Sequence, residues 1–199
     1  QIDRTNAPIQ VEEPIWLDPS RLAVAGRVFY ASDGDFNDVL TGTTTLANTT
    51  PTLLVRIPRG QTVIPLMVAM NQTGTVAGGD IDVIMEFDDV DRYASGGANE
   101  TVFNARTNSG RPSQVEVWSL PTATGAYGIT AWRLRLAADV SPAEGAVQEA
   151  LWQPDAGLVY LDGPASWLIF TNAATTGPSW YWTLKWAEVP TAMLPLAST

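Results

Sequence analysis

The 199-residue sequence contains neither cysteine nor histidine. Without cysteine there are no disulfides and no thiol nucleophiles, and without both residues the usual zinc sites and imidazole acid–base catalysis are excluded as well. Carboxylate chemistry remains available. The composition therefore favours a structural or binding protein, and we expect no enzymatic activity.

Basic residues are scarce. The sequence has 11 Lys and Arg against 21 Asp and Glu, which gives a net charge of −10. Because affinity for nucleic acid comes mainly from cations facing phosphates, we expect no nucleic acid as partner. The same charge argues against binding to an anionic membrane surface. We also expect neither a membrane-spanning helix nor a signal peptide, because the longest apolar candidate, Thr62–Met70, is interrupted by Pro65 and no basic segment precedes an apolar one at the N-terminus.

Short apolar segments separated by Gly, Pro, Asn, Asp and Thr clusters make up most of the chain. About nine strands at such spacing, without a long helical period, predict an all-β fold in which two antiparallel sheets form a sandwich. Helical signals are confined to Ser141–Ala150, and Gly145 weakens them. The predicted strands are Arg21–Ala31, Leu53–Ile57, Thr62–Met70, Asp80–Asp88, Gln114–Leu120, Ile129–Ala138, Val147–Trp152, Ala165–Thr171 and Ser179–Val189.

Apolar and polar residues alternate along three of these strands, Asp80–Asp88, Ile129–Ala138 and Ser179–Val189. Because successive side chains of a strand point to opposite faces, each strand has one face in the core and one in water. Such half-buried strands are typical of antiparallel sheets. The predicted core faces hold Ile81, Val83, Met85 and Phe87; Trp132, Leu134 and Leu136; and Trp180, Trp182, Leu184 and Trp186.

The two ends of the chain differ from the predicted sandwich domain, residues 21–190. Residues 1–20 hold three prolines, which keep the segment extended and argue against a helix, and their charges sum to −3. They form either a disordered leader or an arm across a neighbouring subunit, and we favour the arm because it carries enough apolar surface to dock. Residues 191–199 are predicted to be a peripheral tail. The predicted oligomer-interface residues of the arm are Ile9, Val11, Ile15, Trp16 and Leu17.

A candidate calcium site follows the first predicted strand. Asp33, Asp35, Asn37 and Asp38 place side-chain oxygens at a spacing that resembles the start of a calcium loop. The pattern departs from an EF-hand, because Asp38 stands where glycine is required and Thr44 where glutamate is required. A polar hairpin turn explains the same residues, and we favour it. Calcium is the one cofactor that the sequence leaves open.

Eight tryptophans are the strongest compositional feature. A flat indole suits both sugar stacking and packing in a core or a subunit interface. The period-two positions of Trp132, Trp180, Trp182 and Trp186 favour burial. Trp152, which is followed by Gln-Pro-Asp, is the best candidate for an exposed ring that stacks on sugar, and Trp118 is a second candidate.

Carboxylates and arginines form two further polar rows. Asp82, Glu86 and Asp88 share one strand face, and two such carboxylates can in principle serve a glycosidase. A solvated strand face explains them better. Arg133 and Arg135 share a face of another strand and can pair with the acidic row, either within one subunit or between subunits.

Three segments resemble viral single jelly-roll proteins. They are Ile57–Pro65, which looks like a turn leading into a strand, and Leu161–Phe170 and Tyr181–Pro190, which look like the late strands of such proteins. The resemblance implies a single jelly roll of about eight to nine strands, often trimeric, with a capsid, spike or decoration role and no catalytic residues. Because the chain lacks a basic arm, a place on the outer shell fits it better than contact with a packaged genome.

The sequence thus leads to a virion structural protein, located in the virion. Its expected partners are copies of itself, as a homotrimer or a larger assembly, and other virion proteins. The alternative is a carbohydrate-binding, lectin-like module or receptor binder that recognises a surface glycan. A carboxylate-dependent glycan hydrolase is a distant third interpretation. Jelly rolls host all three functions, so the fold alone does not decide between them.

Overall fold

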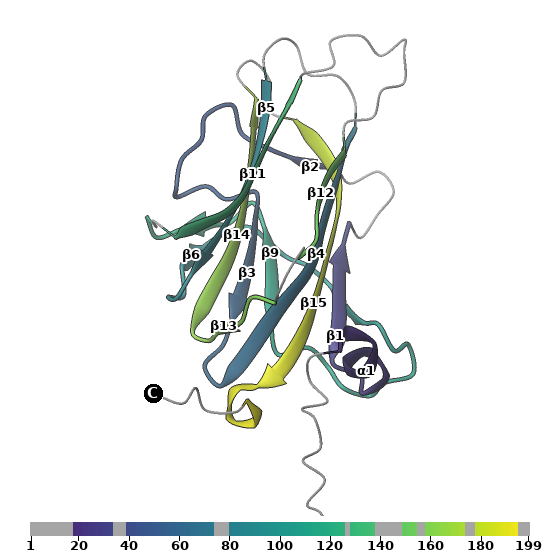
Figure 1. Cartoon of the computed structure of the whole chain (residues 1–199). Coiled ribbons are helices and arrows are strands. Elements are labelled where there is room, and N and C mark those ends of the chain that lie inside the picture. Colours follow the sequence, from purple (N-terminus) through teal and green to yellow (C-terminus); the bar gives the residue numbers. More distant parts are fainter. Residues whose placement is uncertain are drawn as a thin grey trace, which may run out of the picture.

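Antiparallel strands arranged as a two-layer sandwich form the protein (Figure 1). The structure is a computed structural model that describes residues 18–33, 39–73, 80–125, 128–137, 149–154, 158–173 and 178–194. The described residues contain one short α-helix, α1 (Pro19–Val24), and one turn of 3-10 helix, Thr191–Met193. The all-β antiparallel sandwich predicted from the sequence is confirmed.

The first layer, sheet A, has the strand order β12-β4-β15-β1-β8, with β13 paired to β4 and β2 paired to β15. Its two longest strands, β4 and β15, run antiparallel to each other, and their pairing extends from Thr73–Ser179 to Gln61–Pro190. Their register shifts near Pro65, so the residue that lacks an N–H donor lies at an irregularity of the ladder. The strands are β1 (Val28–Ser32), β2 (Leu40–Thr41), β4 (Gln61–Thr73), β8 (Val102–Asn104), β12 (Glu149–Trp152), β13 (Leu161–Asp162) and β15 (Ser179–Pro190).

The second layer, sheet B, has the order β11-β5-β14-β3-β9-β7, and a separate two-stranded ribbon pairs β6 with β10. Short strands such as β6, β7 and β10 were not predicted, because two or three residues carry too little alternation to be recognised. The strands are β3 (Leu53–Ile57), β5 (Asp80–Asp88), β6 (Tyr93–Ser95), β7 (Ala98–Asn99), β9 (Glu116–Ser119), β10 (Thr122–Ala123), β11 (Ile129–Ala137) and β14 (Ala165–Ala173).

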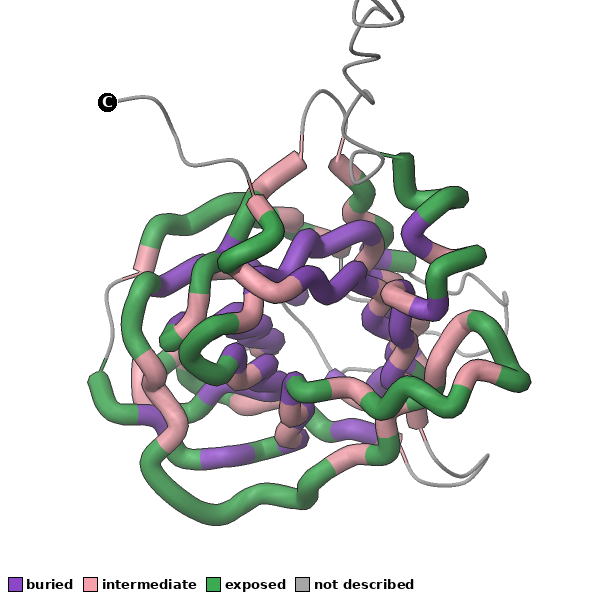
Figure 2. Tube along the Cα trace, turned by 90° about the horizontal axis from the view of Figure 1, so that it is seen from below, coloured by how far each residue is buried: buried purple, intermediate pink, exposed green. Residues whose placement is uncertain are grey.

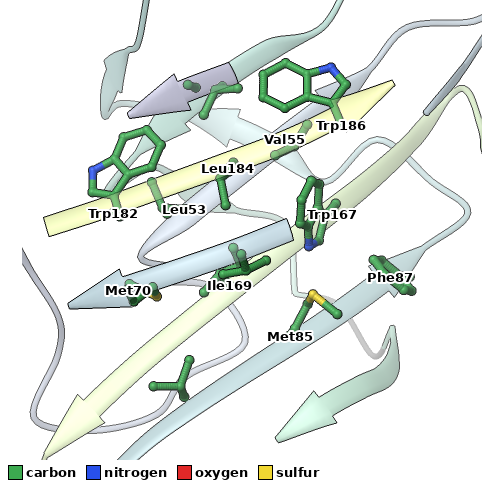
Figure 3. Close-up of a cluster of buried hydrophobic side chains, with 14 of the residues drawn as sticks. Leu53, Val55, Met70, Met85, Phe87, Trp167, Ile169, Trp182, Leu184 and Trp186 are labelled. Carbon is green, nitrogen blue, oxygen red and sulfur yellow. The ribbon is translucent and has the colours of Figure 1, made fainter. Parts of the chain in front are cut away.

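The main core lies between the two sheets (Figure 3). Trp180, Trp182 and Trp186 of β15 are buried, while Tyr181 on the opposite face is 41% exposed, so the predicted alternation is confirmed. Trp132 is half-buried and packs against the same core. Figure 2 shows the buried residues in two layers with exposed segments around them.

A second apolar layer covers much of the outer face of sheet B. Leu54, Leu168 and Phe170 point away from the main core and pack with Ala123 of β10. Half-buried Tyr93 of β6 joins this cluster. The prediction of a solvated acidic face is therefore wrong for β5, because Asp82 is only 8% exposed and Asp88 only 6%. The β6–β10 ribbon forms by pairing residues about 30 positions apart in the sequence. Alternation within one strand does not predict such a long-range cover.

The start of the chain also differs from the prediction, which placed an extended segment before residue 21 and a strand over Arg21–Ala31. Asp18 caps α1, because its carboxylate accepts the Ser20 N–H at 2.8 Å, and Pro19 occupies the first turn. Proline is well tolerated there, since the N–H it lacks would have no partner in a helix. Leu22 packs with Val28 on the outer face of sheet A, and the strand starts only at Val28.

Several predictions fall outside the described residues. They are the arm residues Ile9, Val11, Ile15, Trp16 and Leu17, together with Asp35, Asn37 and Asp38, positions 141–148 and the end of the tail after residue 194. Glu149 and Ala150, the last two positions of the predicted helical segment, lie in strand β12. The predicted tail begins with the 3-10 turn Thr191–Met193.

Candidate functional site

The outer face of sheet A presents large apolar side chains to solvent. Helix α1 covers the part of this face nearest Val28 (Figure 1). Beyond it, Phe103 is 56% exposed, Leu151 48% and Tyr181 41%. We call this uncovered surface the sheet-A face and define it by Tyr30, Met67, Phe103, Leu151, Tyr181 and Lys185.

Strand register places these side chains in rows. One row crosses four strands in the order Phe103, Tyr30, Lys185 and Met67, because each residue is the register partner of the next. The ammonium of Lys185 lies 5.3 Å from the centre of the Tyr30 ring, at cation–π distance. The face is thus a broad surface of aromatic, thioether and aliphatic groups on paired strands. The alternation predicts which residues point outward, but the register that aligns them is a tertiary feature.

The tryptophans predicted to stack on sugar are not free platforms. Trp152 is half-buried, packs against the main core and meets Phe87 edge-on at 6.5 Å between ring centres, so the prediction of an exposed ring is wrong. Trp118 is half-buried and stacks on Tyr93 at 4.5 Å. Its indole N–H donates to Glu116 at 3.3 Å. One face of the Trp118 ring is therefore already occupied by a protein side chain.

The predicted calcium loop is represented by Asp33 alone among the described residues. Its backbone N–H donates to the carbonyl of Trp182 at 3.3 Å, which continues the β1–β15 pairing by one residue. Elsewhere in the described ranges, no group of three or more acidic side chains is arranged to hold a metal ion. Calcium binding at Asp33, Asp35, Asn37 and Asp38 stays a prediction.

The acidic row of β5 pairs with arginines inside the subunit. Asp82 accepts hydrogen bonds from Arg135 at 3.0 Å and from Arg133 at 3.2 Å. Burial works against ionisation of Asp82, but the bonds and charges of the two guanidiniums outweigh it and lower the pKa of this carboxyl. Of the two predicted pairings, the intrasubunit one is therefore present for Asp82.

The other members of the acidic row have different partners. Asp88 accepts from Arg92 at 2.8 Å rather than from β11. Burial raises the pKa of Glu86, against a long hydrogen bond from Thr130 that lowers it and with a smaller contribution from the Asp88 charge. Asp82 and Asp88 are thus each paired with arginine inside the subunit.

A cleft at one end of the sandwich was not predicted from the sequence. It has a volume of about 220 Å³ and lies where β1 begins and β15 ends. We call it the end cleft and define it by Arg27, Phe29, Gln61, Arg111, Gln114 and Glu188.

Glu188 forms the buried polar wall of the end cleft. It is 4% exposed and accepts from the Gln114 backbone N–H and the Trp186 indole N–H, each at 2.9 Å, and from the Ser113 hydroxyl at 2.5 Å. Arg27 and Arg111 lie 84 positions apart in the sequence, and no local motif links them. Only the tertiary structure brings them together.

Comparisons with known proteins give no family for this chain. No protein-family model matches the sequence, and a search of the curated proteins finds no match. In the described part of the chain, no helix has the length and hydropathy needed to cross a lipid bilayer.

Proposed function

We propose that the chain is a virion structural protein that binds copies of itself through the sheet-A face, as a homotrimer or a larger assembly. In this role it forms part of a capsid, decoration or spike layer together with other virion proteins. The observation that carries the proposal is the exposure of Phe103, Leu151 and Tyr181 on one face of a sheet.

We further propose that the sandwich is a single jelly roll. Its eight main strands in chain order are β1, β3, β4, β5, β11, β12, β14 and β15. The first, third, sixth and eighth lie in sheet A, and the second, fourth, fifth and seventh lie in sheet B. Every connection except β5–β11 therefore passes from one sheet to the other, an arrangement that supports a jelly roll, the architecture of many viral coat domains.

The chemistry of the sheet-A face supports protein–protein contact. Aromatic residues and methionine are enriched at the centres of protein interfaces, and large exposed apolar patches mark interaction sites. The face carries Lys185, held over Tyr30, and one exposed acid, Glu149, which lies two residues from Leu151 and in the same register row as Tyr181. Two copies of a protein with net charge −10 repel each other, so their contact is favoured where acidic side chains are few. The same net charge favours the outer shell over contact with a genome.

The test is the molar mass of the protein in solution, by light scattering or native mass spectrometry, over a range of concentrations. We expect a trimer or larger species for the wild type and at least about tenfold weaker association for Phe103→Asp and Leu151→Asp, because each replaces an exposed apolar side chain of the face, on β8 and on β12, with a charge. Ile129→Asp is the matched control, since Ile129 is 78% exposed on β11, in the other sheet. A wild type that stays monomeric at all concentrations and binds glycans would overturn the proposal and favour the lectin-like alternative.

A further inference from the structure

The end cleft holds two guanidiniums that form no ion pair with a described carboxylate. Arg27 makes one side-chain hydrogen bond, to the thioether of Met193 at 3.4 Å, which is a weak acceptor. Arg111 lines the same cleft, is exposed, and makes no ion pair with any residue that the structure describes. Burial and the charge of Arg111 both lower the pKa of Arg27, as expected for a cation placed near another cation.

Of the other described arginines, Arg59 and Arg106 also form no ion pair, whereas the remaining five each reach a carboxylate. Arg92 reaches a carboxylate at 2.8 Å and Arg56 reaches one at 2.7 Å. Arg135 reaches one at 3.0 Å. The nearby acid in the cleft, Glu188, is occupied by three neutral donors. Two guanidiniums against one carboxylate leave the end cleft with a net charge of about +1.

The walls of the cleft are held in place before any ligand arrives. The side-chain amide of Asn104 donates both to the carbonyl of Gly26, at 2.9 Å, and to that of Arg111, at 3.1 Å. Gly26 has a φ of +66°, and a Cβ there would lie 2.5 Å from the Ser109 hydroxyl, so glycine is required for this close approach. The loop carrying Arg111 is therefore fixed against the start of β1, and ligand binding does not have to order it.

We propose that the end cleft binds a glutamate carboxylate, Glu12 or Glu13, from the N-terminal segment of a neighbouring copy. The inference rests on the proposed self-assembly and specifies one of its contacts. Positions 1–17 carry three acids and one arginine, so the segment and the cleft have opposite charges. Guanidinium and carboxylate form the strongest common hydrogen-bonded ion pair in proteins.

Size and charge favour a peptide carboxylate over other anions. A cleft of about 220 Å³ accommodates one or two side chains rather than a polymer. A net charge near +1 suits one carboxylate better than a dianionic phosphate, which would face Glu188 with an uncompensated charge.

The position of the glutamates in the chain limits how far they reach. Glu13 is five residues from Asp18, where the described chain begins, so an extended segment reaches at most about 18 Å beyond Asp18.

The experiment exchanges the charges between two full-length variants. R111E alters the cleft at an exposed side chain that makes no ion pair in the described structure, so folding is expected to be retained. E12K/E13K alters the segment. We expect each variant alone to associate about tenfold more weakly than the wild type, because like charges then face each other. Mixing the two variants is expected to restore association, since the lysines of one variant meet the glutamate introduced by R111E only across a subunit boundary.

Matched controls separate this contact from a general charge effect. R59E makes the same change at another exposed arginine, outside the end cleft, and D89K reverses an exposed acid. Neither control is expected to weaken association as much as R111E.

Three results would overturn the inference in distinguishable ways. If all variants assemble like the wild type, the cleft contact is wrong while self-assembly stands. If the triple variant R111E/E12K/E13K assembles but the mixture does not, the segment binds its own cleft. If the wild type itself never assembles, the proposed function fails and the intersubunit contact fails with it.

Discussion

Removing the buried carboxylate of Glu188 is expected to lower the free energy of unfolding, because three hydrogen-bond donors then lose their acceptor. In Glu188→Ala the Trp186 indole N–H loses its acceptor in a fully buried site, which costs about 1–3 kcal/mol. The Ser113 hydroxyl and the Gln114 N–H border the end cleft, where water can replace the carboxylate, so their loss is smaller. The total is about 2–4 kcal/mol.

Urea unfolding followed by tryptophan fluorescence measures this loss, with thermal unfolding as a second assay. For a domain of this size each kcal/mol lowers Tm by about 2–4 °C, so Glu188→Ala is expected to lower Tm by about 4–16 °C. Glu188→Gln keeps the volume and one acceptor oxygen, but its amide nitrogen cannot accept from Gln114. We expect it to cost about half as much as the alanine variant.

The control is Glu149→Ala, at an exposed carboxylate of β12, which is expected to change stability by less than about 0.5 kcal/mol. The reasoning is refuted if Glu188→Ala unfolds within about 0.5 kcal/mol of the wild type. It is also refuted if the glutamine and alanine variants lose the same stability, because shape and the retained acceptor would then not matter.

Two further predictions concern single side chains. Since Arg135 and Arg133 lower the pKa of Asp82 in the folded state, its ionised form stabilises the fold above the unfolded pKa of about 3.9, and this contribution is lost as the pH falls through the lower folded value. Asp82→Asn is therefore expected to cost about 1–2 kcal/mol at pH 7 and less below about pH 4; a urea midpoint difference that does not depend on pH would contradict this. Asp18→Ala removes the cap of α1 and is expected to cost about 1 kcal/mol, whereas Asp89→Ala, at an exposed turn, serves as the neutral comparison in the same titration.

Local pattern was sufficient to predict the strands that build the core. Along β15 the side chains of Trp180, Trp182 and Trp186 alternate with polar ones, and a strand that follows this period has only one way to bury them. A different local rule fails at the start of the chain, where the three prolines of residues 1–20 argue against a helix. Beside the capping carboxylate of Asp18, Pro19 starts α1 instead.

The acidic residues of β5 show what the alternation of a single strand cannot predict. Alternation placed Asp82 and Asp88 correctly on the face of β5 away from the main core, but it could not report what covers that face. The β6–β10 ribbon packs on the outer face of sheet B. Arginines of β11 pair with Asp82, and Arg92 pairs with Asp88. The predicted exposure of Trp152 failed for the same reason, since Phe87, its ring partner, is 65 positions away.

The sequence alone determined that this chain forms antiparallel strands, that three of them have one apolar and one polar face, and that cysteine and histidine chemistry is absent. Only the tertiary structure decided which strands are neighbours, which outer face remains uncovered, and that Arg27 and Arg111 share a cleft. The physical reason is the range of the interactions. Side-chain alternation is set by the geometry of adjacent residues, whereas pairing, covering and charge proximity depend on segments that meet only after the chain has folded.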